Sequence, residues 1–258
     1  MDKVHIAVAG AGSIGVRHIE EIQRSHGAIL SAIIDPSPKA IEVGRREDAP
    51  VYRSLPEFLA GHRPDGVVLA TPNQMHVEEG LQCIAAGVPV LIEKPIAHTL
   101  EDGARLVQAA ERANAKLLVG HHRRHSRILH KAVEIVQSGV LGRLVAVMGS
   151  AAFYKPDGYF DGPFVWRKEP GGGPILLNMI HEVDNLRAMV GEIVAVQAIA
   201  SSAIRKFRWK IRWRSTCASK MARWEVSCCP IRPLRPSPGN SHRRKTKPTR
   251  HMPMKTPI

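Results

Sequence analysis

The sequence predicts an α/β protein whose first 120 residues form a doubly wound parallel sheet. Two observations support this class. Short apolar runs alternate with longer amphipathic ones, and a glycine-rich turn follows the first apolar run. Such alternation is typical of a parallel sheet with helices on both faces. After it we expect an incomplete α/β (α+β) open-sheet domain over residues 121–203 and an aberrant basic tail over residues 204–258.

The strands of the first domain are expected where short apolar runs lack strict alternation, because such runs suit strands buried on both faces. These runs are Val4–Ala9, Ile29–Ile34, Gly66–Ala70, Val88–Ile92 and Lys116–Val119. The helices expected between them are Ile14–Ser25, Pro38–Arg46, Met75–Ala86 and Leu100–Ala113. Thr99 is the expected N-cap of the last helix, with Asp102 three residues on.

The second domain is expected to begin with a helix over Arg127–Ser138 and a strand over Leu144–Met148. A long loop over residues 154–174 follows, then a helix over Ile175–Val190 and a strand over Ile193–Ala200. Sequence patterns therefore indicate only part of a second sheet.

The charge of the chain is concentrated at one end. The formal net charge is +14, but residues 204–258 hold 16 Lys and Arg against one acid, while residues 1–203 hold 21 against 22 acids. A basic segment with interleaved Trp imitates a nucleic-acid-binding segment. Because the body is nearly neutral, we expect no nucleic-acid partner, and we expect the tail to be disordered.

Cysteine content and hydropathy argue against a disulfide-rich, a secreted or a membrane protein. Cys83 is the only cysteine in residues 1–203, so no disulfide framework is expected there. No stretch approaches the roughly 18 apolar residues of a membrane span, and the N-terminus lacks the pattern of a signal peptide. We therefore expect a cytoplasmic protein with no membrane partner.

The glycine-rich turn Gly10-Ala11-Gly12-Ser13-Ile14-Gly15 fits the dinucleotide-binding pattern between a strand and a helix. Asp35 lies 20 residues past Gly15, at the end of the second strand, where an acid can bind an adenosine ribose. This carboxylate favours NAD over NADP because it would repel a 2′-phosphate, although Lys39 lies nearby. The alternative is a structural turn without a ligand.

Two further segments follow strands, at the edge where open α/β sheets bind ligands. Thr71-Pro72-Asn73 precedes His76, and Glu93-Lys94-Pro95 follows the expected strand Val88–Ile92. Lys94 is a candidate to polarise a substrate hydroxyl; the alternative is a solvated surface charge.

In the second domain, His181 and Asp184 lie three residues apart on the expected helix and so share a face. A histidine there can take a hydroxyl proton as hydride leaves the same carbon. The alternatives are a histidine satisfied within its helix and a metal site, for which no third ligand has fitting spacing. The cluster around His122 and Arg123 is expected to contact cofactor or substrate, or phosphate.

These motifs, with Trp166-Arg167 and Gly171-Gly172-Gly173, resemble the Gfo/Idh/MocA oxidoreductase family over residues 3–203. The resemblance implies a Rossmann domain, NAD (or alternatively NADP) as cofactor, and a sugar or polyol substrate. Lys94 would sit beside nicotinamide and substrate, and His181 would be the acid/base. Trp166, Arg167, His122 and Arg123 would border the nicotinamide, and full-length members form homo-oligomers.

The chain departs from the family pattern at two places. Where many members carry Asp, four residues before the histidine, this chain has Leu177, and Asn178 is the candidate substitute. Family members also continue well beyond 258 residues.

A frameshift near Phe207 would explain the second departure. Reading one nucleotide earlier turns every Trp and Cys of the tail into an apolar residue. One permitted back-translation contains the runs Thr-Val-Ala-Ile-Asn-Leu-Arg-Phe and Ala-Leu-Gly-Ser-Phe-Leu around an Asn-Gly turn, which is a hairpin signal.

Three functions follow as hypotheses. The first is an NAD-dependent dehydrogenase acting on a sugar, polyol or related hydroxy compound. The second is a truncated fragment that binds cofactor without turnover. The third, a basic-tail nucleic-acid binder, would show association that depends steeply on salt.

Overall fold

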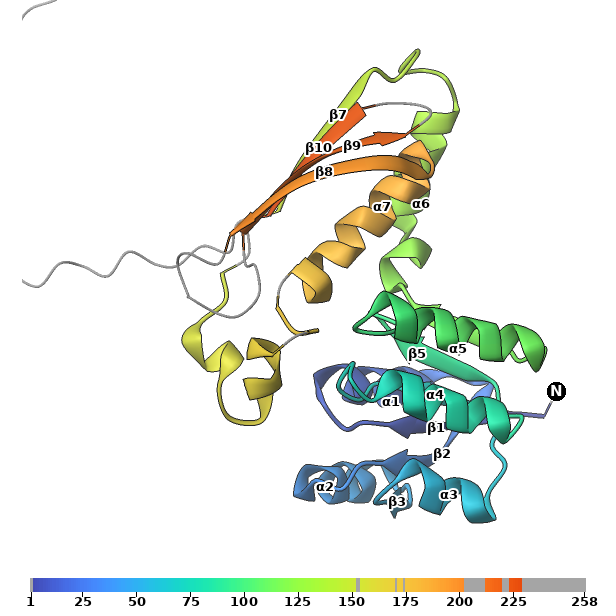
Figure 1. The fold of residues 1–258 in the computed structure, drawn as a ribbon. Coiled ribbons are helices and arrows are strands. Elements are labelled where there is room, and N and C mark those ends of the chain that lie inside the picture. The colour runs from blue at the N-terminus through green and yellow to red at the C-terminus, as the bar shows by residue number, and fades with distance from the viewer. Residues whose placement is uncertain are drawn as a thin grey trace, which may run out of the picture.

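The computed structural model describes residues 2–151, 154–169, 171–173, 175–201, 212–219 and 223–228. Figure 1 shows two layered units: a parallel sheet between helices, and a second sheet with helices against one face. The two units meet near the carboxyl ends of the first sheet's strands.

The first sheet is wholly parallel, with the strand order β3-β2-β1-β4-β5-β6. Its strands are β1 (Val4–Ala9), β2 (Ala28–Ile34), β3 (Val51–Tyr52), β4 (Gly66–Leu69), β5 (Val90–Glu93) and β6 (Leu117–Gly120). Its helices are α1 (Ser13–Arg24), α2 (Pro38–Glu47), α3 (Leu55–Gly61), α4 (His76–Ala85) and α5 (Leu100–Arg112). The predicted doubly wound parallel sheet is confirmed.

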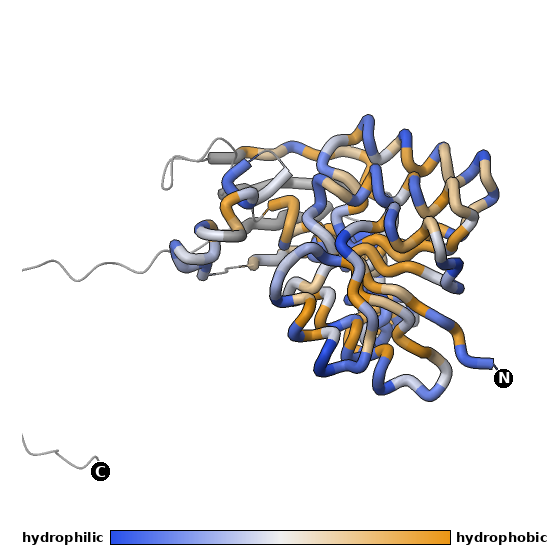
Figure 2. Tube along the Cα trace, turned by 90° about the horizontal axis from the view of Figure 1, so that it is seen from below, coloured by the Kyte–Doolittle hydropathy of each residue, from blue (hydrophilic) through white to orange (hydrophobic). Residues whose placement is uncertain are grey.

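Both faces of this sheet are buried, which explains the apolar runs. Ala7 and Leu69 pack with residues of α3, α4 and α5, whereas Val8 and Ile33 pack with residues of α1 and α2. In Figure 2 the strands of this domain are mostly hydrophobic, and hydrophilic positions recur on the surrounding helices and turns.

Local predictions for this domain hold with two omissions. Thr99 caps α5 as expected, because its hydroxyl accepts from the Asp102 amide at 3.1 Å. The short strand β3 and the helix α3 were not predicted, since two residues show no periodicity and a helix of seven residues, with Pro56 in its first turn, spans barely two turns. Both matter, because the loop between them lines the site described below.

The second unit contains η1 (His122–His125), α6 (Arg127–Gln137), β7 (Ala146–Ala151), η2 (Asp157–Phe160), η3 (Gly162–Lys168), η4 (Ile175–Met179), α7 (Ile180–Val190), β8 (Ile193–Ser201), β9 (Arg212–Ser219) and β10 (Arg223–Cys228). The loop expected over residues 154–174 contains the 3₁₀ turns η2 and η3, and η4 is a π-helical turn leading into α7. The sheet order is β7-β10-β9-β8, with β10 parallel to β7 and the other pairs antiparallel.

The expectation of a disordered tail is wrong for residues 212–219 and 223–228. These residues form β9 and β10 and complete a four-stranded sheet with β7 and β8. Strand pairing uses backbone hydrogen bonds, so the basic composition that suggested disorder does not prevent it. The rest of residues 204–258 lies outside the described residues.

Candidate active site

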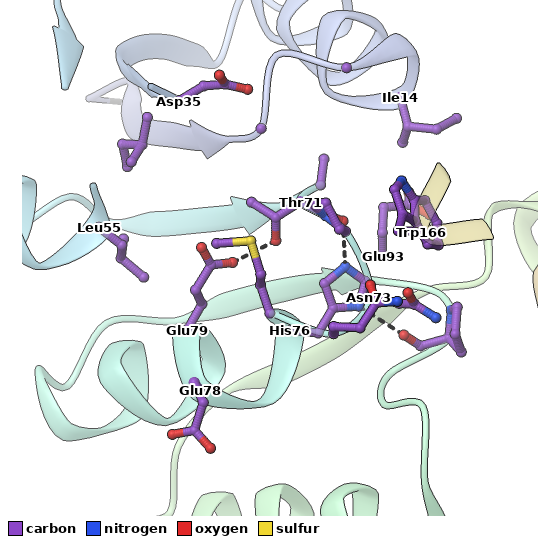
Figure 3. Close-up of a pocket in the computed structure, with 18 of the residues that line it drawn as sticks. Ile14, Asp35, Leu55, Thr71, Asn73, His76, Glu78, Glu79, Glu93 and Trp166 are labelled. Carbon is purple, nitrogen blue, oxygen red and sulfur yellow. Dashed lines mark hydrogen bonds between the residues drawn. The ribbon is translucent and has the colours of Figure 1, made fainter. Parts of the chain in front are cut away.

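A cavity of about 870 Å³ opens at the carboxyl ends of β1, β2, β4 and β5. Its walls include three of the predicted segments, which are the glycine-rich turn, Thr71–Asn73 and Glu93–Pro95. The second unit contributes Tyr159, Phe164, Trp166, Arg167, Leu177 and Asn178. Figure 3 shows Asp35 and Leu55 at one end and Ile14, Glu93 and Trp166 at the other.

At Gly10 and Gly15 of the glycine-rich turn, the backbone packs directly against other backbone atoms and leaves no room for a side chain. Gly10 has φ +95°, and a Cβ there would lie 2.6 Å from the Ala70 carbonyl oxygen. A Cβ on Gly15 would lie 1.7 Å from the Gly10 carbonyl oxygen. At Gly12 a Cβ would meet no atom within 4 Å, so this turn leaves open space over the start of α1.

That open space suits an anion. Gly12 is the N-cap of α1, no side chain caps it, and the first turn holds no acidic residue. The free amides and the helix dipole therefore favour a negative group there. The residues present fit the pyrophosphate of a dinucleotide.

Asp35 supports the glycine-rich turn directly. One carboxylate oxygen accepts from the Ala11 amide at 2.7 Å and the other from the Ser37 amide at 2.8 Å. The carboxylate is half-buried and lines the cavity. Its remaining lone pairs can accept from ribose hydroxyls.

His76 connects the two predicted loops. It is buried, with Nδ1 2.8 Å from the Pro95 carbonyl oxygen and Nε2 2.9 Å from the Thr71 carbonyl oxygen. Burial is the largest effect on its pKa, which it lowers. Its structural position is therefore a bridge that fixes both loops, as well as part of the cavity wall.

Asn73 and Glu93 are also held by partners. The Asn73 side chain donates to the Gly171 carbonyl oxygen of the second unit. Glu93 pairs with His18 of α1 at 2.9 Å and accepts from the Lys94 amide. The pKa of Glu93 is lowered: burial raises it, but His18 and Lys94 outweigh that effect.

Lys94 reaches across to the second unit, where Nζ donates to the Leu177 carbonyl oxygen at 2.9 Å. Its pKa is lowered, first by burial and then by the nearby cations Arg123, Lys155 and Arg167, although Glu93 raises it. Lys94 is thus a partly buried cation held by a backbone carbonyl group. The alternative interpretation of Lys94 as a solvated surface charge is wrong.

His181 lies within a group of basic side chains. Burial and then the charges of Lys94, Arg123 and other neighbours lower its pKa to about 4. The His122 ring lies edge-on, 4.7 Å between centroids. Nδ1 of His181 is buried and has no hydrogen-bond partner among the described residues. The imidazole is therefore neutral at neutral pH.

Asp184 does not orient His181. Its carboxylate binds the Arg124 guanidinium at 2.5 and 3.1 Å and lies 3.7 Å from His121 Nδ1. Asp184 thus ties α7 to η1, and its pKa is lowered because Arg124 and His121 outweigh the effect of burial. The prediction that His181 and Asp184 lie on one helix is confirmed, since both belong to α7.

The remaining predicted residues fall into two groups. Trp166, Arg167 and Asn178 line the cavity, and Oδ1 of Asn178 is buried and unpaired within the described part of the chain. Arg167 lies 4.0 Å from the Tyr159 ring centroid and 4.2 Å from that of Phe164. His122 and Arg123 are not part of the wall but flank His181, and Arg123 pairs with Glu182 at 2.5 Å.

Sequence patterns missed several contributors. His18, Leu55 and Glu79 were not singled out, yet Leu55 and Glu79 line the cavity and His18 holds Glu93. His18 follows the glycine-rich turn by one helical turn, and this spacing was its only signal. Glu79 looks like an ordinary solvated helix residue in the sequence and is buried in the structure.

Other site types find no support in the described residues. No group of three or more His, Cys, Asp or Glu side chains there could hold a metal ion. Within the same residues, no helix combines the length and hydropathy that crossing a bilayer needs.

Comparison with protein families gives two matches in order along the chain. Residues 4–121 match the oxidoreductase family model with the NAD-binding Rossmann fold, and residues 129–221 match the Gfo/Idh/MocA C-terminal domain model. The second match extends past residue 203 into the segment that contains β9.

Curated relatives share the same region. The 1,5-anhydro-D-fructose reductase of Ensifer adhaerens is 36% identical over 149 residues, covering 58% of this chain and 44% of the relative. An inositol 2-dehydrogenase of Corynebacterium glutamicum is 32% identical over 151 residues, covering 57% and 44%. The chain spans about half the length of the curated relatives it matches.

Among solved structures, the WlbA dehydrogenase of Bordetella pertussis in complex with NADH and UDP-GlcNAcA superposes with a TM-score of 0.82 and 29% identity. The match covers 87% of this chain and 70% of that one. The architecture is thus similar to that of a dehydrogenase whose structure was solved with NADH.

Proposed function

Because the chain belongs to the Gfo/Idh/MocA oxidoreductase family, we propose that it transfers a hydride between NAD and a carbon of a sugar, polyol or related hydroxy compound. One observation carries the proposal. Lys94 and His181, from different domains, lie close enough for the Lys94 charge to lower the histidine's pKa, beside the dinucleotide-type cavity.

Lys94 would hold the substrate oxygen. Its ammonium is partly buried, so an alkoxide or carbonyl oxygen next to it gains more stabilisation than it would in water. The Leu177 carbonyl oxygen fixes where Nζ points, and the Glu93 carboxylate accepts from the Lys94 backbone amide. A substrate oxygen would take one of the two remaining donor positions of the ammonium.

His181 would exchange the hydroxyl proton. A pKa of about 4 leaves the imidazole neutral at pH 7, so it can accept the proton during oxidation. Asn178, adjacent to this helix and unpaired at Oδ1, would orient a second hydroxyl group of the substrate. Trp166 and Arg167 would exclude water from the nicotinamide end of the cavity.

The cofactor preference would follow from Asp35. When bound, NAD supplies the hydride acceptor, and its adenosine ribose hydroxyls would bind the Asp35 carboxylate. A 2′-phosphate would place two negative groups together, so NADP is the poorer fit. We propose NAD, with a substrate of the sugar or inositol class that the relatives' names indicate.

The experiment is a titration of the purified chain with NADH and NADPH, followed by nicotinamide fluorescence. Gly12→Asp is the control, because its side chain enters open space and places a carboxylate where the pyrophosphate would bind. Saturable NADH binding that this variant loses supports the site. Failure of the folded wild-type chain to bind either dinucleotide would refute the proposal.

Turnover then separates the enzyme from an inactive cofactor-binding fragment. A panel of inositols, aldoses and sugar acids with NAD, monitored at the NADH absorbance, should give a rate that Lys94→Met abolishes. NADH binding with no turnover on any member of the panel would favour the fragment.

We also propose self-association through the uncovered face of the second sheet. Met148, Val194 and Val196 are 87%, 59% and 58% exposed, on the face opposite Val147 and Ile193, which pack against α7. Met148 lies on the edge strand β7, and Val194 and Val196 lie on the opposite edge strand β8. Exposed apolar side chains on a sheet face are typical of an interface between chains. Light scattering during size-exclusion chromatography should show a dimer or larger species that Val196→Lys disrupts; an unchanged monomer would contradict this.

A further inference from the structure

Glu79 is a buried carboxyl group in the wall of the cavity, at the end away from Lys94. Its residue is 8% exposed, and it lies on α4 one helical turn after His76. Figure 3 shows its carboxylate facing the space bounded by Asp35, Leu55 and Thr71. The mechanism proposed above does not use this group.

The partners of Glu79 leave it incompletely satisfied. Its single hydrogen bond within the described residues comes from the Thr71 hydroxyl, at 2.5 Å to Oε2. Glu93 has His18 and Asp184 has Arg124, whereas no cation of the described chain pairs with Glu79. Burial therefore raises its pKa, with only Thr71 acting against that effect. A buried carboxylate with free lone pairs is costly unless a ligand donates to it.

The positions of Gly12 and Asp35 indicate which part of a bound dinucleotide would lie next to Glu79. With the pyrophosphate at Gly12 and the ribose at Asp35, the base must continue toward Leu55 and away from Trp166. Pro36, Leu55 and Met75 line that end and offer apolar surface for the faces of a flat ring. The polar side chains that α4 adds to the cavity wall are His76, Glu78, Glu79 and Gln82. Glu78 pairs with Arg105, so Glu79 is the carboxylate of this helix that is left without a cation among the described residues.

We propose that Glu79 selects adenine as the base of the dinucleotide, by accepting a hydrogen bond from its exocyclic amino group. The proposal rests on the dinucleotide binding proposed above. An amino group donates and meets the free lone pairs of the carboxylate. A keto group at the same ring position is an acceptor, and it would face a negatively charged acceptor at close range.

The test compares NADH with reduced nicotinamide hypoxanthine dinucleotide, which carries a keto group in place of the amino group. Dissociation constants for both are measured by nicotinamide fluorescence on the wild-type chain, Glu79→Gln and Glu111→Gln. Gln keeps an acceptor for the Thr71 hydroxyl and can present either an oxygen or an amide nitrogen to the base. Glu111 is an exposed residue of α5 outside the cavity wall and controls for loss of a negative charge.

The wild-type chain and Glu111→Gln should bind NADH at least about tenfold more tightly than the hypoxanthine analogue, the size expected for one charge-assisted hydrogen bond. Glu79→Gln should bring the two constants close to equality.

Equal affinities in the wild-type chain would overturn the proposal without any variant, while leaving dinucleotide binding intact. An undiminished preference in folded Glu79→Gln would overturn it equally. Failure of the wild-type chain to bind NADH at all would instead refute the proposed function.

Discussion

The Lys94 ammonium donates to the Leu177 backbone carbonyl oxygen across 83 residues of sequence and joins the two domains at the reacting end of the cavity. A backbone group therefore holds the lysine, although position 177 carries an apolar side chain.

Leu177→Ala should keep this hydrogen bond because the carbonyl remains, so NADH affinity should stay within about twofold of the wild type. The side chain is 8% exposed, and its truncation should lower the free energy of unfolding by about 2–3 kcal/mol. Denaturant unfolding and NADH titration measure the two effects. A large loss of NADH binding with unchanged stability would contradict the assigned role of the carbonyl.

Asp35→Asn should weaken the preference for NADH over NADPH by about tenfold, because it removes one negative charge and keeps one acceptor oxygen. The variant retains an oxygen for either the Ala11 or the Ser37 amide, so the turn should persist. The ratio of the two dissociation constants is the measurement. If that ratio does not move, Asp35 does not discriminate between the dinucleotides.

Asp184→Asn should destabilise the chain and leave NADH binding unchanged. The carboxylate is 9% exposed and carries a two-point contact to Arg124, so the loss should be about 2 kcal/mol, discounted because Arg124 is partly solvated. Thermal unfolding and NADH titration check this. A fall in turnover at unchanged melting temperature would restore a catalytic role for Asp184.

Stability should rise with pH from about 4 to 6.5. Burial lowers the pKa values of His76, His121 and His181, the last to about 4. In that window the unfolded chain binds more protons than the folded one, so stability is lost as the pH falls. His181→Gln should reduce the slope by up to about 1.4 kcal/mol per pH unit, as melting temperatures across the range would show. An unchanged slope would mean that His181 titrates normally.

Replacing residues 208–230 by the back-translated sequence should stabilise the second domain. Its two strand-like runs fall on positions 212–219 and 223–228, the bounds of β9 and β10. The large apolar residues of the first run would then fall on alternate strand positions and so share one face of the sheet. These positions are 213, 215, 217 and 219, where the present chain has Trp213, Ser215, Cys217 and Ser219. We expect a higher melting temperature and less aggregation. The gene sequence gives an independent check, since a closed reading frame one base back after codon 207 would eliminate the frameshift hypothesis.

Sequence alone determined the first domain and the loops of its site. The apolar period, the glycine-rich turn and the position of Asp35 are local signals, because each reflects backbone geometry or burial within a few residues. The same signals placed Thr71, Lys94 and His181 on the elements that carry them. The strand β3 has two residues and the helix α3 has seven, so neither is long enough to show a hydrophobic period in the sequence.

Tertiary structure decided which groups meet. Packing between distant segments brings Asp184 to Arg124 and makes His76 a bridge between two loops. It also buries Glu79 in the cavity wall. The tail shows the same division: its composition gave charge, but pairing with β7 and β8 is a matter of backbone hydrogen bonds that composition does not record. The sequence gives the chemistry of each side chain, whereas its burial and its partners arise only when the chain folds. Burial and partners set the pKa values and leave lone pairs free for a ligand, and function depends on both.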